Sequence, residues 1–216
     1  MVPETVRVPP NPGVSMPRTP SSHSLSAALI PALLLTLVAS GCISVSTFPS
    51  PRVLERGEGQ LGGGVLFGVD LEGEESGLGE LALLGRYGVG DRVDVGGKLW
   101  GFPPFLGIYG DVRYQLLREP LLISGALGAS WMSFDEFSTG ALYPTVMFGT
   151  DRFFAGARWT FLTATGTDLE ETFGATFPGA VVGATFGGRL IFAPEVNVLF
   201  GEETAVMPGA AVMVRF

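Results

Sequence analysis

The chain has 216 residues, of which 32 are glycine, and its 13 basic and 21 acidic residues give a formal net charge of −8. Such an acidic chain is a poor partner for nucleic acid, because phosphate binding needs clustered lysine and arginine. The length suits one domain, and glycine at about twice its usual share, without a collagen period, favours curved β-structure. The mean hydropathy is positive, at +0.39, although no apolar run after residue 38 has the length of a spanning helix. This combination is expected for alternating lipid-facing strands.

An apolar run spans residues 25–38, close to the N-terminus. It is shorter than the roughly 20 residues that a spanning helix needs and suits the central region of a secretory signal peptide. The run leads into Ala-Ser-Gly-Cys at residues 39–42, which resembles the lipobox of bacterial lipoproteins, although Ala39 stands where leucine is most common. The resemblance implies cleavage before Cys42, a covalent lipid on its sulfur, and a signal peptide over residues 1–41.

Cys42 is the only cysteine, so it cannot form a disulfide within the chain. The alternative is an ordinary secretory signal followed by an incidental cysteine. Residues 1–15 are proline-rich and unlike the start of a signal peptide, which makes Met16 an alternative start. Ile43, by analogy with enteric bacteria, permits sorting to the outer membrane, where two or three acyl chains would hold the protein firmly. Removal of residues 1–41 leaves 11 basic and 20 acidic residues and a net charge of −9.

Residues 42–58 contain two prolines and mixed charges and are predicted to form the lipidated N-terminus and a short tether. From residue 59 the chain alternates with a period of two, as strands with two unlike faces do. Residues 59–216 are therefore predicted to form an all-β domain of about ten strands, with eight as the alternative count. The ten predicted strands span residues 60–71, 78–89, 92–101, 106–117, 121–133, 141–149, 153–164, 174–186, 189–200 and 206–216.

One face of these predicted strands is apolar and free of charge, except that the phase of residues 174–186 stays open. A membrane barrel requires this, because a lysine or arginine facing lipid costs about 2–4 kcal/mol at the midplane. The other face has too few charges for a water-exposed surface. Gly96 lies on that face, and its replacement by serine is expected to be tolerated. This face predicts a small lumen plugged by paired charges. The predicted lumen charges are Glu80, Arg86, Asp94, Lys98, Asp111, Arg113, Arg158, Glu195 and Arg215.

The joins between strands fall into two sets. Short joins that carry or border an arginine alternate with the joins of a second set, as expected for a barrel with both termini in the periplasm. Four joins of this second set are acidic and contain no lysine or arginine, whereas the join over residues 102–105 belongs to the same set but is uncharged. The acidic joins are predicted to be solvated extracellular loops, and they hold Glu72, Glu74, Glu75, Asp135, Glu136, Asp168, Glu170, Glu171, Glu202 and Glu203. The alternative is that carboxylates there bind Ca²⁺ or Mg²⁺ and bridge to lipopolysaccharide. These contacts would come from Glu72, Glu74, Glu75, Asp168, Glu170 and Glu171; no firm metal site is predicted.

The last predicted strand ends on Phe216, and a terminal aromatic on an alternating strand resembles the signal that the barrel-assembly machinery recognises. Residues 59–216 as a whole resemble small bacterial outer-membrane β-barrels of the OmpA-like or opacity-like class. The resemblance implies an antiparallel up-and-down transmembrane barrel in the outer membrane, with the lipid-anchored N-terminus on the periplasmic side. Outer-membrane lipid, lipopolysaccharide and the barrel-assembly machinery are the implied partners. Five aromatic residues are predicted to form interfacial girdles: Tyr87, Tyr114, Trp131, Trp159 and Phe200.

The only histidine, His23, lies in the predicted signal peptide. The mature chain thus lacks the histidine base of common hydrolytic sites and the usual ligands of a catalytic zinc. We expect no enzyme activity and no cofactor beyond the lipid on Cys42 and loop-bound Ca²⁺ or Mg²⁺. The class of barrel includes structural or surface proteins and narrow channels. The alternative is a soluble or periplasmic lipocalin-like barrel that binds an apolar ligand, in which the apolar side chains would point inward.

Overall fold

The structure is a computed structural model that describes residues 50–69, 76–102, 105–134, 137–166, 173–201 and 204–216. Every regular element in these ranges is a β-strand. No helix formed by the described residues is long and apolar enough to cross a membrane. The predictions for Cys42 and for residues 1–41 lie outside these ranges. So do the predictions for Glu72, Glu74, Glu75, Asp135, Glu136, Asp168, Glu170, Glu171, Glu202 and Glu203.

The strands follow one another along the chain with short joins. They are β1 (Gly59–Val69), β2 (Ser76–Gly88), β3 (Val93–Phe102), β4 (Phe105–Leu117), β5 (Leu122–Phe134), β6 (Phe137–Gly149), β7 (Phe153–Gly166), β8 (Phe173–Ala184), β9 (Phe186–Gly187), β10 (Leu190–Leu199) and β11 (Ala205–Arg215). The two-residue strand β9 follows β8 after Thr185, and both pair with β10. The barrel therefore has ten full-length strands, which confirms the predicted count over the alternative of eight.

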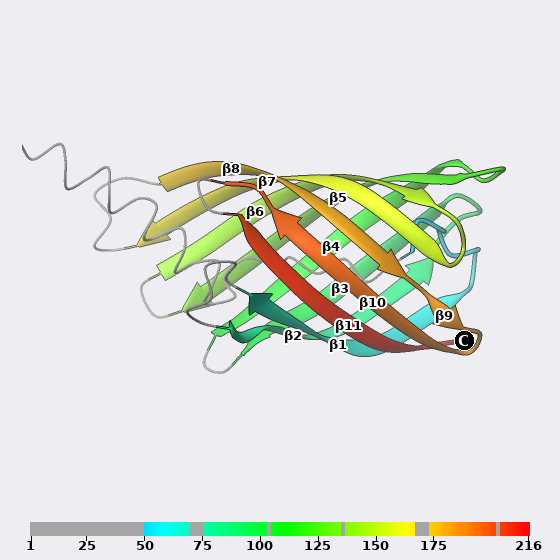
Figure 1. Cartoon of the computed structure of the whole chain (residues 1–216), viewed down its shortest axis with the longest axis horizontal. Coiled ribbons are helices and arrows are strands. Elements are labelled where there is room, and N and C mark those ends of the chain that lie inside the picture. Colours follow the sequence, from blue (N-terminus) through cyan, green and yellow to red (C-terminus); the bar gives the residue numbers. More distant parts are fainter. Residues whose placement is uncertain (1–49, 70–75, 103–104, 135–136, 167–172, 202–203) are drawn as a thin grey trace, which may run out of the picture.

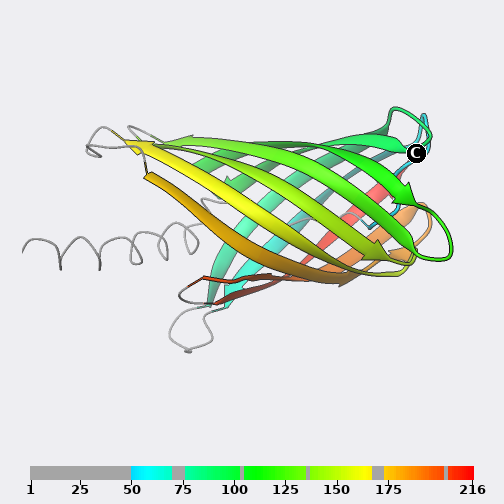
Figure 2. The ribbon, with the colours of Figure 1, turned by 90° about the horizontal axis from the view of Figure 1, so that it is seen from above.

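The sheet closes on itself. Each strand pairs antiparallel with the next along the chain, and β11 pairs with both β10 and β1. Figures 1 and 2 show the result, a barrel of strands that are strongly tilted against its long axis. The shortest seam joins β8 to β10, where five residue pairs run from Glu195–Gly183 to Leu199–Gly179. Closure leaves no full strand with an unpaired edge, as a hydrocarbon environment requires.

The two faces of the barrel wall have opposite character. On β4, Leu106, Ile108 and Val112 are more than half exposed to the outside, whereas Asp111 and Arg113 are buried inside. The outer face carries no charged residue in the described strands and is mostly apolar, and the nine charged residues within strands are all buried or partly buried on the lumen side. This is the polarity of a membrane barrel and the reverse of a lipocalin-like one. It also resolves the open phase of β8, where Val181 is buried and Val182 is exposed.

The chain enters β1 and leaves β11 at the same end of the barrel, here called the near end (Figure 1). The opposite end, here called the far end, has five joins between strands. The lengths predicted for these joins are only partly right. Only two residues separate Phe134 from Phe137, which pair with each other, although the sequence predicted a loop over residues 134–140. Residues 137–140 have the composition of a loop (Phe-Ser-Thr-Gly), but pairing with β5 and β7 on both sides overrides that local preference.

An arginine on the outer face should prevent stable assembly. Val112 lies near the middle of β4 and is more than half exposed on the apolar side. Val112→Arg is expected to lower the free energy of unfolding by about 2–4 kcal/mol, because a guanidinium at the midplane loses its hydration. Denaturant titration in lipid vesicles measures this, with Val112→Ala as the apolar control. Equal stability of the two variants would contradict the lipid-facing assignment.

Candidate functional site

Four charged side chains form an ionic cluster in the lumen towards the near end. They come from three neighbouring strands: Arg86 from β2, Asp94 from β3, and Asp111 and Arg113 from β4. The Arg86 guanidinium donates to the Asp94 carboxylate and to both oxygens of Asp111, each at 2.6 Å. Arg113 donates to both Asp94 oxygens, through Nη2 at 2.7 Å and Nε at 3.2 Å. Two cations and two anions are thus matched, as buried charges require.

Gly96 makes this cluster possible. It lies on β3 directly opposite both Arg86 on β2 and Asp111 on β4. Because glycine has no side chain, the Arg86 and Asp111 groups meet over the β3 backbone. A Cβ atom at Gly96 would overlap both the Arg86 guanidinium and the Asp111 carboxylate. This geometry argues against the expectation that the position tolerates serine, because the space over Gly96 is already filled by the Arg86 and Asp111 side chains.

A second cluster of polar side chains lies further along the lumen. Lys98 Nζ donates to Glu80 Oε1 at 2.7 Å, and its ammonium lies 5.3 Å from the centre of the Tyr109 ring. Glu195 and Arg158 also act electrostatically on Lys98. Contacts with neighbouring groups hold these last two side chains: Asn197 Nδ2 donates to Glu195 Oε1 at 2.7 Å, and the Arg158 guanidinium stacks over the Tyr143 ring at 5.4 Å. The two cations and two carboxylates again match in number.

Large apolar side chains fill the lumen between and beyond the ionic groups. One buried group contains Trp100, Met132, Ile191 and Met213, and another contains Leu66, Tyr143, Leu162, Leu199 and Met207. The sequence predicted a lumen plugged by paired charges, so this apolar filling adds to what was expected. The abundance of glycine in the sequence is the feature that could have predicted this apolar filling. Trp100 covers Gly107, Tyr109 covers Gly128 and Phe154 covers Gly183, so bulky lumen residues lie against glycines of the adjacent strand.

The structure places eight of the nine predicted lumen charges in these two clusters. Arg215 lies apart from both, at the near mouth, where it borders a hollow of about 580 Å³ together with Arg56, Glu58 and Arg189. Its Nε atom is buried and has no hydrogen-bond partner among the described residues. Phe216 follows on the outer rim, two-thirds exposed, with its backbone paired to Gly59.

Residues 50–58, which the sequence assigned to a tether, lie across the near mouth and are called the strap below. Val53 and Leu54 are buried there, and side chains of β3 and β4 bond to their backbone. The segment shows no periodicity, so this contact could not be predicted from the sequence. Gln115 of β4 takes part as well, although an uncharged glutamine gave no sign of a role.

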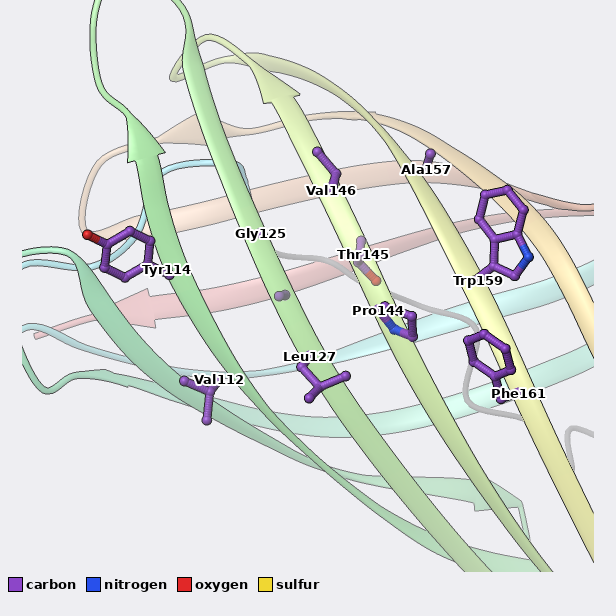
Figure 3. A pocket seen from close by; sticks show the side chains of 11 residues that line it. Val112, Tyr114, Gly125, Leu127, Pro144, Thr145, Val146, Ala157, Trp159 and Phe161 are labelled. Atoms are coloured by element: carbon purple, nitrogen blue, oxygen red, sulfur yellow. The ribbon is translucent and has the colours of Figure 1, made fainter.

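The outer face carries a shallow apolar hollow of about 890 Å³ over β4 to β7 (Figure 3). Pro144 lies between the larger side chains of Leu127 and Trp159, and the small residues Gly125 and Ala157 lie further along the same two strands as Leu127 and Trp159 (Figure 3). Trp159 is the seventh of fourteen residues in β7, so it does not lie at a strand end as the girdle prediction required. The hollow is therefore part of the lipid-facing belt.

No protein-family model matches the chain, and no curated protein sequence matches it. Solved structures with a similar fold include the attachment invasion locus protein Ail of Yersinia pestis (12% identity over 74% of this chain and 99% of that one, TM-score 0.30). The N-terminal β-barrel domain of Pseudomonas aeruginosa OprF is 14% identical, with 76% and 100% of the two chains covered and a TM-score of 0.33. Outer membrane phospholipase A from Escherichia coli is 9% identical, with 76% and 94% covered and a TM-score of 0.35. The fold itself is a closed antiparallel β-barrel of ten full-length strands among the described residues.

The two adjacent glycines of β3 provide a matched test of the ionic cluster. Gly96→Ala is expected to destabilise the barrel by about 1–3 kcal/mol, because the added methyl group displaces Arg86 or Asp111. Gly97→Ala should be nearly neutral, since Gly97 faces outward and its nearest neighbour would be the Tyr109 carbonyl oxygen at 3.7 Å. Urea midpoints of the two variants measure the difference. Equal midpoints would show that the cluster does not require this space.

Proposed function

We propose that the protein is a structural or surface barrel of the bacterial outer membrane whose lumen is closed. The observation that carries this proposal is the filling of the lumen by large side chains that contact one another. Trp100, Tyr143 and Arg113 are each at most 2% exposed although they point into the barrel. In a water-filled pore, such side chains would be hydrated. A ten-stranded barrel is little wider than one of eight strands, whose interior side chains fill nearly completely.

The charge balance of the lumen supports a structural role for its ions. Arg86, Arg113, Asp94 and Asp111 neutralise one another, and Lys98 pairs with Glu80. A pore that selects ions by charge needs an excess of one sign along its wall. Matched pairs instead join neighbouring strands through side chains.

A narrow channel is the second candidate. The polar clusters favour it, because a lumen that served only to be filled could be wholly apolar. Conductance measurements separate the two candidates.

We do not propose a catalytic role. The only histidine precedes residue 42, and no group of three metal-ligating side chains occurs among the described residues. A lipocalin-like role requires an apolar interior cavity and a polar exterior. The outward-facing leucine, isoleucine and valine side chains have the opposite arrangement.

For the orientation, we propose that the near end faces the periplasm and the acidic far-end joins face outward. Cys42 lies eight residues before Ser50, so a lipid on Cys42 could be attached at most about 28 Å from the near mouth. Outer-membrane lipid and lipopolysaccharide are the proposed surroundings, with Ca²⁺ or Mg²⁺ bridging between far-end carboxylates and lipid phosphates. The proposed role of Phe216 is recognition by the barrel-assembly machinery.

Purified protein in planar bilayers should show no large conductance. The physical reason is that Trp100, Arg113 and the other buried lumen residues leave no wide water-filled path. A general porin measured in the same bilayers is the positive control. Large, stable, weakly selective channels would contradict the closed lumen. Small openings that change in Lys98→Gln would instead favour the narrow channel.

Acyl labelling tests the proposed anchor. Radiolabelled fatty acid should enter the wild-type protein, and Cys42→Ser should remove the label and leave unprocessed precursor, because only the thiol can accept the lipid. The matched control is Ser40→Ala, which keeps the cysteine and a small residue before it. Normal processing of Cys42→Ser would indicate an ordinary secretory signal.

A further inference from the structure

The strap, residues 50–58, lies at the near end of the barrel, at the same end as the C-terminus in Figures 1 and 2. It crosses from the start of β1 towards β4 and the join between β6 and β7. Its backbone is held by side chains of the barrel. Val53 N–H donates to Gln115 Oε1 at 2.8 Å, and Leu54 N–H donates to Asp94 Oδ2 at 2.9 Å. Arg113 donates to the carbonyl oxygens of Ser50 and Arg52.

These hydrogen bonds bind the main chain of the strap as an extended segment. Two successive N–H groups and two carbonyl groups of the strap find fixed partners, and these partners come from β3 and β4. Such bonds do not depend on the side chains of the strap. Extended peptides are recognised in this way elsewhere: main-chain bonds supply affinity, and pockets for a few side chains supply selectivity.

Selectivity would come from two adjacent apolar residues. Val53 and Leu54 are 2% and 3% exposed, whereas Arg52, Glu55 and Arg56 on either side are exposed to solvent. The buried pair sits over the barrel opening, and the charged residues point away from it. A bound peptide is typically anchored by a few buried apolar side chains together with hydrogen bonds to its backbone, and the strap has both.

The barrel makes room for the strap backbone at Gly88, the last residue of β2. A Cβ atom there would overlap the carbonyl of Glu55 and crowd the carbonyl of Leu54. The obstacle would be backbone rather than a flexible side chain, so the strap would have to move. Gly85 on the same strand has no such neighbour, since its Cβ would lie 3.5 Å from the Leu61 side chain.

The link from the strap to β1 is an exposed turn. Gly57 has a φ of +87°, a conformation that favours glycine, and a side chain there would meet nothing within 4 Å. The strap therefore docks as a short ligand that a covalent turn holds beside its site. The turn is itself bonded to β2, since Gly57 N–H donates to the Gly88 carbonyl oxygen and Gly88 N–H donates to the Glu58 carbonyl oxygen, each at 2.9 Å. A covalent link as short as this one keeps the strap beside its site at a high effective concentration.

From this geometry we propose that the near mouth is a binding site for an extended peptide and that the strap is its resident, exchangeable ligand. The class of ligand is an extended segment with two adjacent apolar residues at the positions of Val53 and Leu54. The segment argued to occupy it is residues 50–58 of this chain, in cis or supplied in trans. The proposal concerns the mouth and stands apart from whether the lumen conducts.

The experiment uses the full chain with a protease site inserted between Arg56 and Gly57, where the turn is exposed. The full chain without lipid on Cys42 is folded first, and the strap is then cut, so that only its contacts retain it. A fluorescent synthetic peptide of residues 50–56, the part that the cut releases, is added, and its uptake is followed by anisotropy in detergent micelles. We expect the labelled peptide to replace the cut strap and unlabelled peptide to compete with it.

Matched variants give the test its specificity. Peptides with Val53→Asp or Leu54→Asp should bind about tenfold more weakly or worse, because a carboxylate would be buried, whereas an Arg56→Ala peptide should bind like the original. The barrel variant Gly88→Ala should lose uptake by a similar factor, and Gly85→Ala should retain it. Heat-modifiable gel mobility checks that each barrel is folded, and the peptide series decides the question if Gly88→Ala fails to fold.

Two results would overturn the proposal. One is a cut barrel that takes up no labelled peptide, whether its own strap has left or stays permanently in place. The other is uptake that is equal for all peptides and for both glycine variants, which would mean adsorption to micelles. Neither result bears on conductance, so the closed lumen and the peptide site can fail independently.

Discussion

The rest of the structure depends on the backbone hydrogen bonds of a sheet that water cannot reach. In hydrocarbon an unpaired N–H or C=O group costs several kcal/mol, so a spanning sheet must close. Here β11 supplies closure by pairing with β10 on one side and β1 on the other. An even number of antiparallel strands then brings both ends of the barrel domain to the same end. The near mouth, with its strap and with Phe216, is therefore a consequence of closure.

Closure also fixes how much space lies inside. A barrel of ten strands is too narrow for a wide water channel and too wide for small side chains alone to fill. The lumen is filled by placing large residues against glycines of the adjacent strand. Gly96 admits the Arg86–Asp111 pair, and Gly107 admits the Trp100 ring. The high glycine content thus serves packing inside the barrel as much as curvature of its wall.

Burial decides which charges can occupy such a lumen. Removing one partner of a buried pair leaves an uncompensated charge, at a cost of about 3–5 kcal/mol. The four charges around Gly96 therefore behave as one unit that joins β2, β3 and β4 through side chains. Asp94 and Arg113 of this unit also bond to the strap backbone. The stability of the wall and the occupation of the mouth are coupled through these two residues.

The sequence by itself predicted the class of fold, a count of about ten strands and the side of the wall on which each strand charge lies. Those features follow from local alternation, because a period of two assigns each residue to a face and lipid excludes charge from one of them. Arg113 and Val112 are assigned correctly for that reason. Only the tertiary structure decided which charges meet, that Gly96 must lack a side chain, that residues 137–140 continue a strand, and that Val53 and Leu54 are buried. Those outcomes depend on register between strands and on contacts between residues far apart in the chain, 40 positions for Leu54 and Asp94 and 62 for Val53 and Gln115, which no local pattern encodes.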